Sequence, residues 1–442
     1  MAVKVQLITL GCSKNRVDSE HLLRQIFSGG ISILPEGEDL SVVGADTVII
    51  NTCGFIKDAK EESVETILNA CEAKSRGYIQ KIFVFGCLSQ RYREELKEQI
   101  PEVDGFFGAF DSRSVISALG HTWNEDLNNR RYLTTPSHYA YLKISEGCDR
   151  ICSYCSIPLI RGSHISVPEI DLVDEAKHLA DMGVKELIVV AQDTTYYGVD
   201  LYKERKLASL LENLSRINGI EWIRLLYSYP ASFPERVLDV MASNPKICKY
   251  LDIPLQHIND KVLSNMRRNI NGEATRRLVA NFREKVPGIV LRTTMIIGHP
   301  GETKAAFNEL LEFVSEAKFE RLGAFTYSEE EGTWGANNLK DTIREKEKQE
   351  RYLRLMELQS EISLNYNLSR KGQQERVLID NYNDGVFVGR SKNESPEVDG
   401  EILIAPDRFH SEANSKEIIG TFVNVTIENA DEYDLMAKFS KI

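Results

Sequence analysis

The first hundred residues repeat one pattern three times: a short apolar run, a glycine beside a cysteine, and a longer helical stretch. The apolar runs span 3–10, 46–51 and 81–85, and the helical stretches follow at 16–27, 57–74 and 90–99. Alternating strands and helices of this kind predict a parallel sheet. We therefore expect an N-terminal α/β domain over residues 1–125.

A second series of alternating strands and helices begins near Tyr139. Strand-like runs are expected at 139–145, 187–191, 222–227, 250–253, 290–297 and 322–326. Six such units predict a partial (βα)6 barrel of the TIM type, with functional side chains at the carboxyl ends of its strands. This central domain spans residues 134–368, and its last part, 341–369, has the periodicity of a charge-rich helix.

The pattern changes again after Arg370. Short alternating runs at 376–381, 385–389, 400–404 and 421–428, separated by turn-forming Asn, Asp and Gly residues, predict a small all-β barrel over 370–442. The fold class is therefore α/β overall, with a parallel-sheet domain, a partial barrel and a C-terminal OB-like barrel.

Three cysteines lie on one short polar loop. Cys148, Cys152 and Cys155 follow a C-x3-C-x2-C spacing. An electron-transfer 4Fe-4S cluster is held by four cysteines, so a cluster held by three leaves one iron open for a substrate or cofactor. Two other interpretations are a zinc site, which needs a fourth ligand such as His138 or His164, and three buried structural thiols.

A second set of three cysteines is spread over the N-terminal domain. Cys12, Cys53 and Cys87 each fall just past the carboxyl end of a predicted strand. Loops from adjacent parallel strands converge at that edge, so the three thiols can meet although they are distant in sequence. Chance placement of small buried residues is the alternative, and we expect it to hold for Cys71 and Cys248.

These motifs resemble those of the radical S-adenosylmethionine (SAM) methylthiotransferases. The run from Ile144 to Pro158 resembles the signature of the superfamily. The runs 11–16, 51–56 and 86–91 resemble the N-terminal domain of the family, and residues 370–442 resemble its TRAM domain. The resemblance covers essentially the whole chain.

The resemblance implies two 4Fe-4S clusters, one held by Cys148, Cys152 and Cys155 and the other by the trio in the N-terminal domain. It also implies SAM in two roles, as methyl donor to sulfur and as radical source, together with an external electron donor and a sulfur donor. The protein supplies binding and orientation, while the cofactor supplies the chemistry.

Candidates for the SAM pocket come from the polar residues in and after the barrel strands. Gln192, Gln256 and Arg292 are the three that we rank first. The first cysteine loop also follows a strand, so it faces the same mouth of the barrel.

Charge bears on the choice of substrate. The chain carries a net charge of -12, and residues 370–442 hold more Asp and Glu than Lys and Arg. An acidic surface repels phosphates, so a basic protein partner is favoured over nucleic acid. Within the family this favours the type that methylthiolates the β-carbon of an aspartate in the twelfth small-subunit ribosomal protein. Methylthiolation of a modified adenosine in tRNA and a noncatalytic iron-sulfur scaffold are the alternatives.

The sequence favours a cytoplasmic location without a membrane partner. No apolar run approaches the roughly 18 residues of a membrane span, and the first ten residues have the pattern of a strand. Eight cysteines in such a chain indicate metal or redox use more than disulfides.

Overall fold

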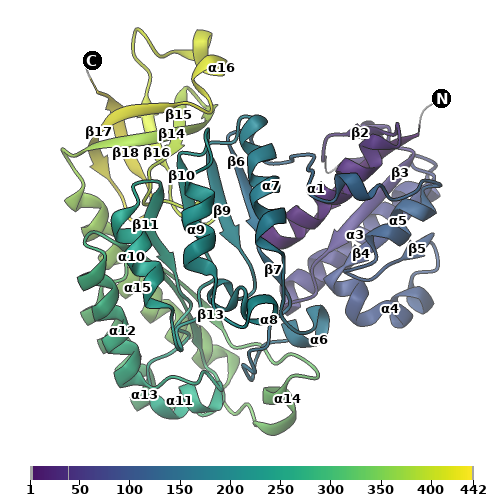
Figure 1. The fold of residues 1–442 in the computed structure, drawn as a ribbon. Coiled ribbons are helices and arrows are strands. Elements are labelled where there is room, and N and C mark those ends of the chain that lie inside the picture. Colours follow the sequence, from purple (N-terminus) through teal and green to yellow (C-terminus); the bar gives the residue numbers. More distant parts are fainter. Residues whose placement is uncertain (1–2, 38, 441–442) are drawn as a thin grey trace.

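The computed structural model describes residues 3–37 and 39–440, which form three successive units (Figure 1). The N-terminal unit is a five-stranded sheet in the order β2-β1-β3-β4-β5, parallel throughout. Its strands are β1 (Lys4–Thr9), β2 (Ser32–Leu34), β3 (Thr47–Thr52), β4 (Lys81–Gly86) and β5 (Gly105–Phe106). Its helices are α1 (Ser13–Ser28), α2 (Leu40–Val43), α3 (Lys57–Ser75), α4 (Cys87–Gln99) and α5 (Ser112–Ala118).

Helices cover both faces of this sheet. Successive side chains of a strand point to opposite faces, so Val48 and Ile50 of β3 pack in one apolar core with Ile67 of α3. Ile49, between them, packs in the other core with Leu22 of α1. Burial on both faces explains why the strands are continuous apolar runs instead of alternating ones.

The central unit is an open, six-stranded parallel sheet in the order β13-β12-β11-β10-β9-β6. The strands are β6 (Tyr139–Lys143), β9 (Glu186–Val190), β10 (Trp222–Leu225), β11 (Ile247–Asp252), β12 (Val290–Ile297) and β13 (Arg321–Thr326). A short hairpin of β7 (Ser145–Glu146) and β8 (Ile165–Ser166) follows β6. The helices are α6 (Ile157–Arg161), α7 (Glu169–Asp181), α8 (Val199–Tyr202), α9 (Leu207–Ser215), α10 (Glu235–Ser243), α11 (Asp260–Asn265), α12 (Gly272–Lys285), α13 (Lys304–Ala317), α14 (Trp334–Asn338) and α15 (Glu345–Ser369).

The barrel stays open because its edge strands, β6 and β13, are not paired with each other. Helix α1 of the N-terminal unit packs along β6, and α15 packs along β13. Val17 of α1 shares an apolar cluster with Tyr141 of β6. The predicted six-stranded barrel is confirmed, and α15 begins four residues after the expected helix start.

The C-terminal unit is a closed barrel of β14 (Gln374–Asn383), β15 (Val386–Arg390), β16 (Ile402–Ala405), β17 (Phe422–Ala430) and β18 (Leu435–Phe439), with α16 (Ser415–Ile418) in a connection. Strand β18 was not among the predicted runs, yet it closes the barrel between β16 and β17. Among the helices in residues 3–37 and 39–440, none combines the length and apolar content that a bilayer crossing needs.

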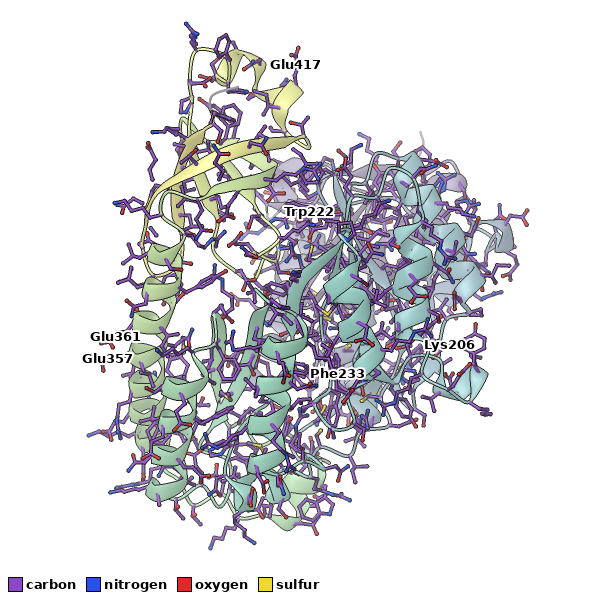
Figure 2. The ribbon with its side chains drawn as sticks, turned by 60° about the vertical axis from the view of Figure 1, so that its left-hand side comes forward. Lys206, Trp222, Phe233, Glu357, Glu361 and Glu417 are labelled. Carbon is purple, nitrogen blue, oxygen red and sulfur yellow. The ribbon has the colours of Figure 1, made fainter. Side chains whose placement is uncertain are left out.

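The C-terminal barrel packs against the amino-terminal ends of the central strands. Trp222, at the start of β10, is fully buried against Phe422 of β17, with ring centroids 4.7 Å apart (Figure 2). In the loop between β15 and β16, Glu397 accepts a hydrogen bond from the Tyr141 hydroxyl at 2.8 Å. The same loop carries Asp399, which accepts one from the Tyr250 hydroxyl at 2.5 Å. This loop therefore fixes the C-terminal unit to the central one.

A buried ion-pair network lies at the same junction. Glu394 pairs with Arg321 at the start of β13 and with Arg370 at the end of α15. Burial opposes ionisation of Glu394, but the two guanidinium groups outweigh it and lower its pKa to about 2. The carboxylate thus stays charged and holds together three segments that are distant in sequence.

Removing this carboxylate should destabilise the protein strongly. In Glu394→Gln, two buried guanidinium groups lose their shared partner, so we expect the free energy of unfolding in urea to fall by about 3–5 kcal/mol. The matched control is Glu357→Gln on the exposed face of α15 (Figure 2), which should change it by less than about 0.5 kcal/mol. Equal stability of the two variants would contradict the structural role of Glu394.

Candidate active site between two cysteine trios

The structure brings Cys12, Cys53 and Cys87 to one edge of the N-terminal sheet. Cys12 is the N-cap of α1, Cys53 directly follows β3, and Cys87 is the first residue of α4. Because β1, β3 and β4 are adjacent and parallel, the loops that follow them meet. Burial, together with smaller contributions from Cys12 and Cys87, raises the pKa of the Cys53 thiol to about 12.

Arg161 of the central unit reaches this trio. Its Nε donates to the sulfur of Cys87 at 3.2 Å, and its Nη2 donates to the side-chain oxygen of Asn15 at 2.7 Å. Asp18 and Glu146 hold the guanidinium at 2.9 and 3.0 Å. Burial raises the pKa of Cys87, while Arg161 opposes that rise by favouring the thiolate, which is the form that binds a metal.

The other trio, Cys148, Cys152 and Cys155, lies on the loop between β7 and α6, beyond the carboxyl end of β6. Burial raises the pKa of Cys148 to about 12, although the backbone N–H of Arg150 points at its sulfur from 3.4 Å. Burial likewise raises the pKa of Cys155, and the charges of Cys152 and Cys148 add to the rise. The loop turns back on itself here, since the backbone N–H of Cys155 donates to the carbonyl of Cys152 at 3.2 Å.

The two cysteine loops touch each other. The Ser156 hydroxyl, next to Cys155, donates to the carbonyl of Phe55 at 3.4 Å, two residues after Cys53. A second contact joins the same two units: Lys60 of α3 pairs with Glu330, in the loop after β13, at 2.8 Å. The cysteine edge of the N-terminal sheet thus faces the carboxyl mouth of the open barrel.

The donor geometry does not match a single metal ion. Among the described residues, no three His, Cys, Asp or Glu side chains are close enough to share one ion. A 4Fe-4S cube needs a wider spacing between its thiolates than a single ion does, because each thiolate binds a different iron. Of the two possible histidine ligands, His138 bonds through Nε2 to Asp380 at 2.7 Å, and His164 bonds through Nε2 to Ser166 at 3.0 Å while its Nδ1 has no partner among the described residues. The structure therefore does not support the zinc interpretation.

Gln192 and Gln256 present unpaired amide oxygens near the mouth. In both, the side-chain oxygen is buried and has no hydrogen-bond partner among the described residues. Gln256 also adopts a left-handed backbone (φ 73°), and Gln192 donates its amide to Glu146 at 2.8 Å. Buried unpaired acceptors and strained non-glycine residues are typical of ligand sites.

Arg292 occupies a different position. Its guanidinium contacts Asp252 at 3.0 Å and Asp399 of the C-terminal unit at 3.5 Å. It also lines a cavity of about 690 Å³ beside the C-terminal barrel, together with Tyr139 at the start of β6 and Arg321 at the start of β13. Arg292 therefore lies between the C-terminal unit and Asp252, the last residue of β11, and its place in the SAM site stays a prediction.

Sequence reasoning missed Lys14 and Tyr227. The ammonium nitrogen of Lys14 lies 3.2 Å from the centre of the Tyr227 ring, just past β10. Tyr227 has a left-handed backbone (φ 59°), and its N–H donates to Asp252 at 2.9 Å. The only signal in the sequence is that Lys14 is two residues from Cys12, and this spacing does not reveal that its side chain enters the barrel.

Comparisons with known proteins agree with this architecture. The Radical SAM superfamily matches residues 142–314, the uncharacterized protein family UPF0004 matches 4–108, and the TRAM domain matches 372–439. Among solved structures, the radical SAM methyltransferase TsrM from Kitasatospora setae aligns with a TM-score of 0.55 at 15% identity, over 74% of this chain and 72% of that one. An open six-stranded barrel with a three-cysteine loop at its mouth defines a radical SAM enzyme.

Curated relatives narrow the class to one family. The ribosomal protein uS12 methylthiotransferase RimO of Bacteroides thetaiotaomicron is 50% identical over 98% of both chains. The RimO of Porphyromonas gingivalis strain ATCC 33277 is 51% identical, again over 98% of both chains. The chain belongs to the RimO family of methylthiotransferases.

The loop that carries Cys148, Cys152 and Cys155 depends on Gly147, which immediately precedes Cys148. Its φ is +68°, and a Cβ here would lie 2.1 Å from the carbonyl oxygen of Ser163. We expect Gly147→Ala to lower the free energy of unfolding by about 1–3 kcal/mol more than Gly77→Ala. Gly77 is the matched control, since it has a similar φ of +79° with nothing within 4 Å of the added carbon. If both variants lost the same free energy of unfolding in urea, the loop would be able to accommodate the added carbon without strain.

Proposed function

We propose that this protein transfers a methylthio group to the β-carbon of an aspartate in ribosomal protein uS12. SAM serves both as methyl donor and as radical source. The observation that carries the proposal is the contact between the two cysteine loops, which lets two reactive centres act on one substrate atom. The names of the full-length relatives support the same substrate.

Each cysteine trio fits a 4Fe-4S cluster with one open iron. The remaining cysteines are unsuited as fourth ligands. Cys71 is a residue of α3 that packs against the core of the N-terminal unit, and Cys248 is fully buried within β11. When bound, the cluster at Cys148, Cys152 and Cys155 would bind SAM and supply the radical that takes a hydrogen atom, and the other would carry the sulfur.

The protein's own residues bind and orient these groups. Gln192 and Gln256 have free amide oxygens for the polar groups of SAM. Arg161 bonds to Cys87 and so holds the N-terminal trio against the barrel. Overall, the substrate C–H bond is replaced by a C–S bond. The hydrogen leaves in 5'-deoxyadenosine, with methionine as the other fragment of that SAM, and the methyl group comes from a second SAM, which leaves as S-adenosylhomocysteine. A sulfur donor and an external electron donor supply the remaining atoms and electrons.

The substrate can be tested directly. Reduced, cluster-loaded protein is incubated with SAM, a sulfide source and one of two substrates. These are uS12 and tRNA that carries the modified adenosine without its methylthio group, and the products are analysed by mass spectrometry. We expect a methylthio adduct on the target aspartate of uS12 and none on tRNA. An adduct on tRNA alone would refute the assignment, and absence of SAM cleavage would favour a noncatalytic scaffold.

The two trios should be separable by substitution. Wild type should hold about eight irons, and Cys53→Ala and Cys152→Ala about four each. Cys53→Ala should still cleave SAM but not methylthiolate uS12, whereas Cys152→Ala should lose both activities. Cys71→Ala is the control and should match wild type in iron content and SAM cleavage. Full iron content in Cys53→Ala would show that the N-terminal trio does not hold a cluster.

A further inference from the structure

Lys14 is a buried cation that forms no ion pair with a carboxylate of the described residues. Its side chain projects from the first turn of α1, and the residue is 7% exposed. Among the residues that the structure describes, no carboxylate oxygen lies within the 4.0 Å of an ion pair from its nitrogen. Its ammonium nitrogen lies over the face of the Tyr227 ring, 3.2 Å from the centroid. A ring face attracts a cation but leaves its hydrogen-bond donors free.

Three other cations at this interface are paired with carboxylates. Lys143 and Arg161 each contact both Asp18 and Glu146. Arg131 pairs with Glu20 and a second carboxylate. Burying a charge without a partner is costly, so a buried cation that no carboxylate neutralises is a candidate site for an anionic ligand.

The protein's nearby carboxylate is already engaged. Tyr227 and Cys12 act on Lys14 electrostatically, and Asp252 does so more weakly. However, one oxygen of Asp252 accepts from Arg292 at 3.0 Å, and the other accepts from the N–H of Tyr227 at 2.9 Å. The charge of Lys14 thus remains available to an incoming anion.

The location of Lys14 indicates which anion. Lys14 is two residues from Cys12, in the N-terminal trio, and contacts Tyr227 just past the carboxyl end of β10. We infer that Lys14 binds the side-chain carboxylate of the substrate aspartate, an inference that rests on the proposed function. The carboxylate carbon is bonded directly to the β-carbon. Holding the carboxylate at Lys14 therefore places the β-carbon between the barrel mouth and the edge that carries the sulfur.

SAM also has a carboxylate, but its expected place is different. The open iron of the cluster at Cys148, Cys152 and Cys155 takes the amino and carboxylate groups of SAM in the superfamily that this loop resembles. Lys14 lies instead in the first turn of α1, two residues after Cys12 of the N-terminal trio. The substrate carboxylate is therefore the better match for Lys14.

The test compares two uS12 peptides, one with the target aspartate and one with asparagine in its place. Binding to full-length, cluster-loaded protein is measured by fluorescence anisotropy without reductant, so that no turnover occurs. Wild type should bind the aspartyl peptide about tenfold more tightly, because only a carboxylate forms a charge-assisted bond with Lys14. In Lys14→Met the preference should fall to within about twofold, and Lys14→Arg should restore part of it.

Lys97→Met, on the exposed face of α4, is the control and should keep the tenfold preference. A Lys14→Met variant that keeps this preference would overturn the inference. If that variant instead loses affinity for SAM, measured by equilibrium dialysis, then Lys14 holds the SAM carboxylate and the inference is also wrong. Failure of wild type to methylthiolate uS12 would refute the proposed function itself, and with it the role of Lys14; the activity assay distinguishes this result from the peptide comparison.

Discussion

The contact between the carboxyl edge of the N-terminal sheet and the mouth of the open barrel is the constraint on which the rest of the structure depends. Asp18 and Glu146 lie between Lys143 and Arg161, so four mostly buried charges from both units neutralise one another. Such a network tolerates little displacement, since a shift would leave a charge buried and unpaired. It therefore fixes the relative position of the two cysteine trios.

The open barrel in turn depends on its neighbours. A six-stranded parallel sheet with two free edges would expose backbone groups and apolar surface, and α1 and α15 pack along those edges. At the other end of the strands, Trp222 is covered by the C-terminal barrel. The three units are thus parts of one packed structure, and the site lies where the first two meet.

The structure changes the weight of the charge argument. The acidic excess of residues 370–442 includes Glu394, Glu397 and Asp399, which are bonded to groups of the central unit. Asp380 is likewise paired with Arg390 and His138. These carboxylates stabilise the junction and do not form a surface that would repel nucleic acid. The preference for a protein substrate therefore draws its support from the relatives more than from net charge.

Sequence alone determined the features that depend on local order along the chain. Apolar periodicity gave the main strands and helices, and the spacing of Cys148, Cys152 and Cys155 indicated their chemistry. It did not find β2, β5 or β18, because very short strands and a closing strand are defined by their partners. Only the tertiary structure decided that Lys14 enters the barrel while Arg292 lies beside the C-terminal unit. Both outcomes depend on contacts between segments far apart in the chain, and no local pattern encodes the direction in which such side chains point.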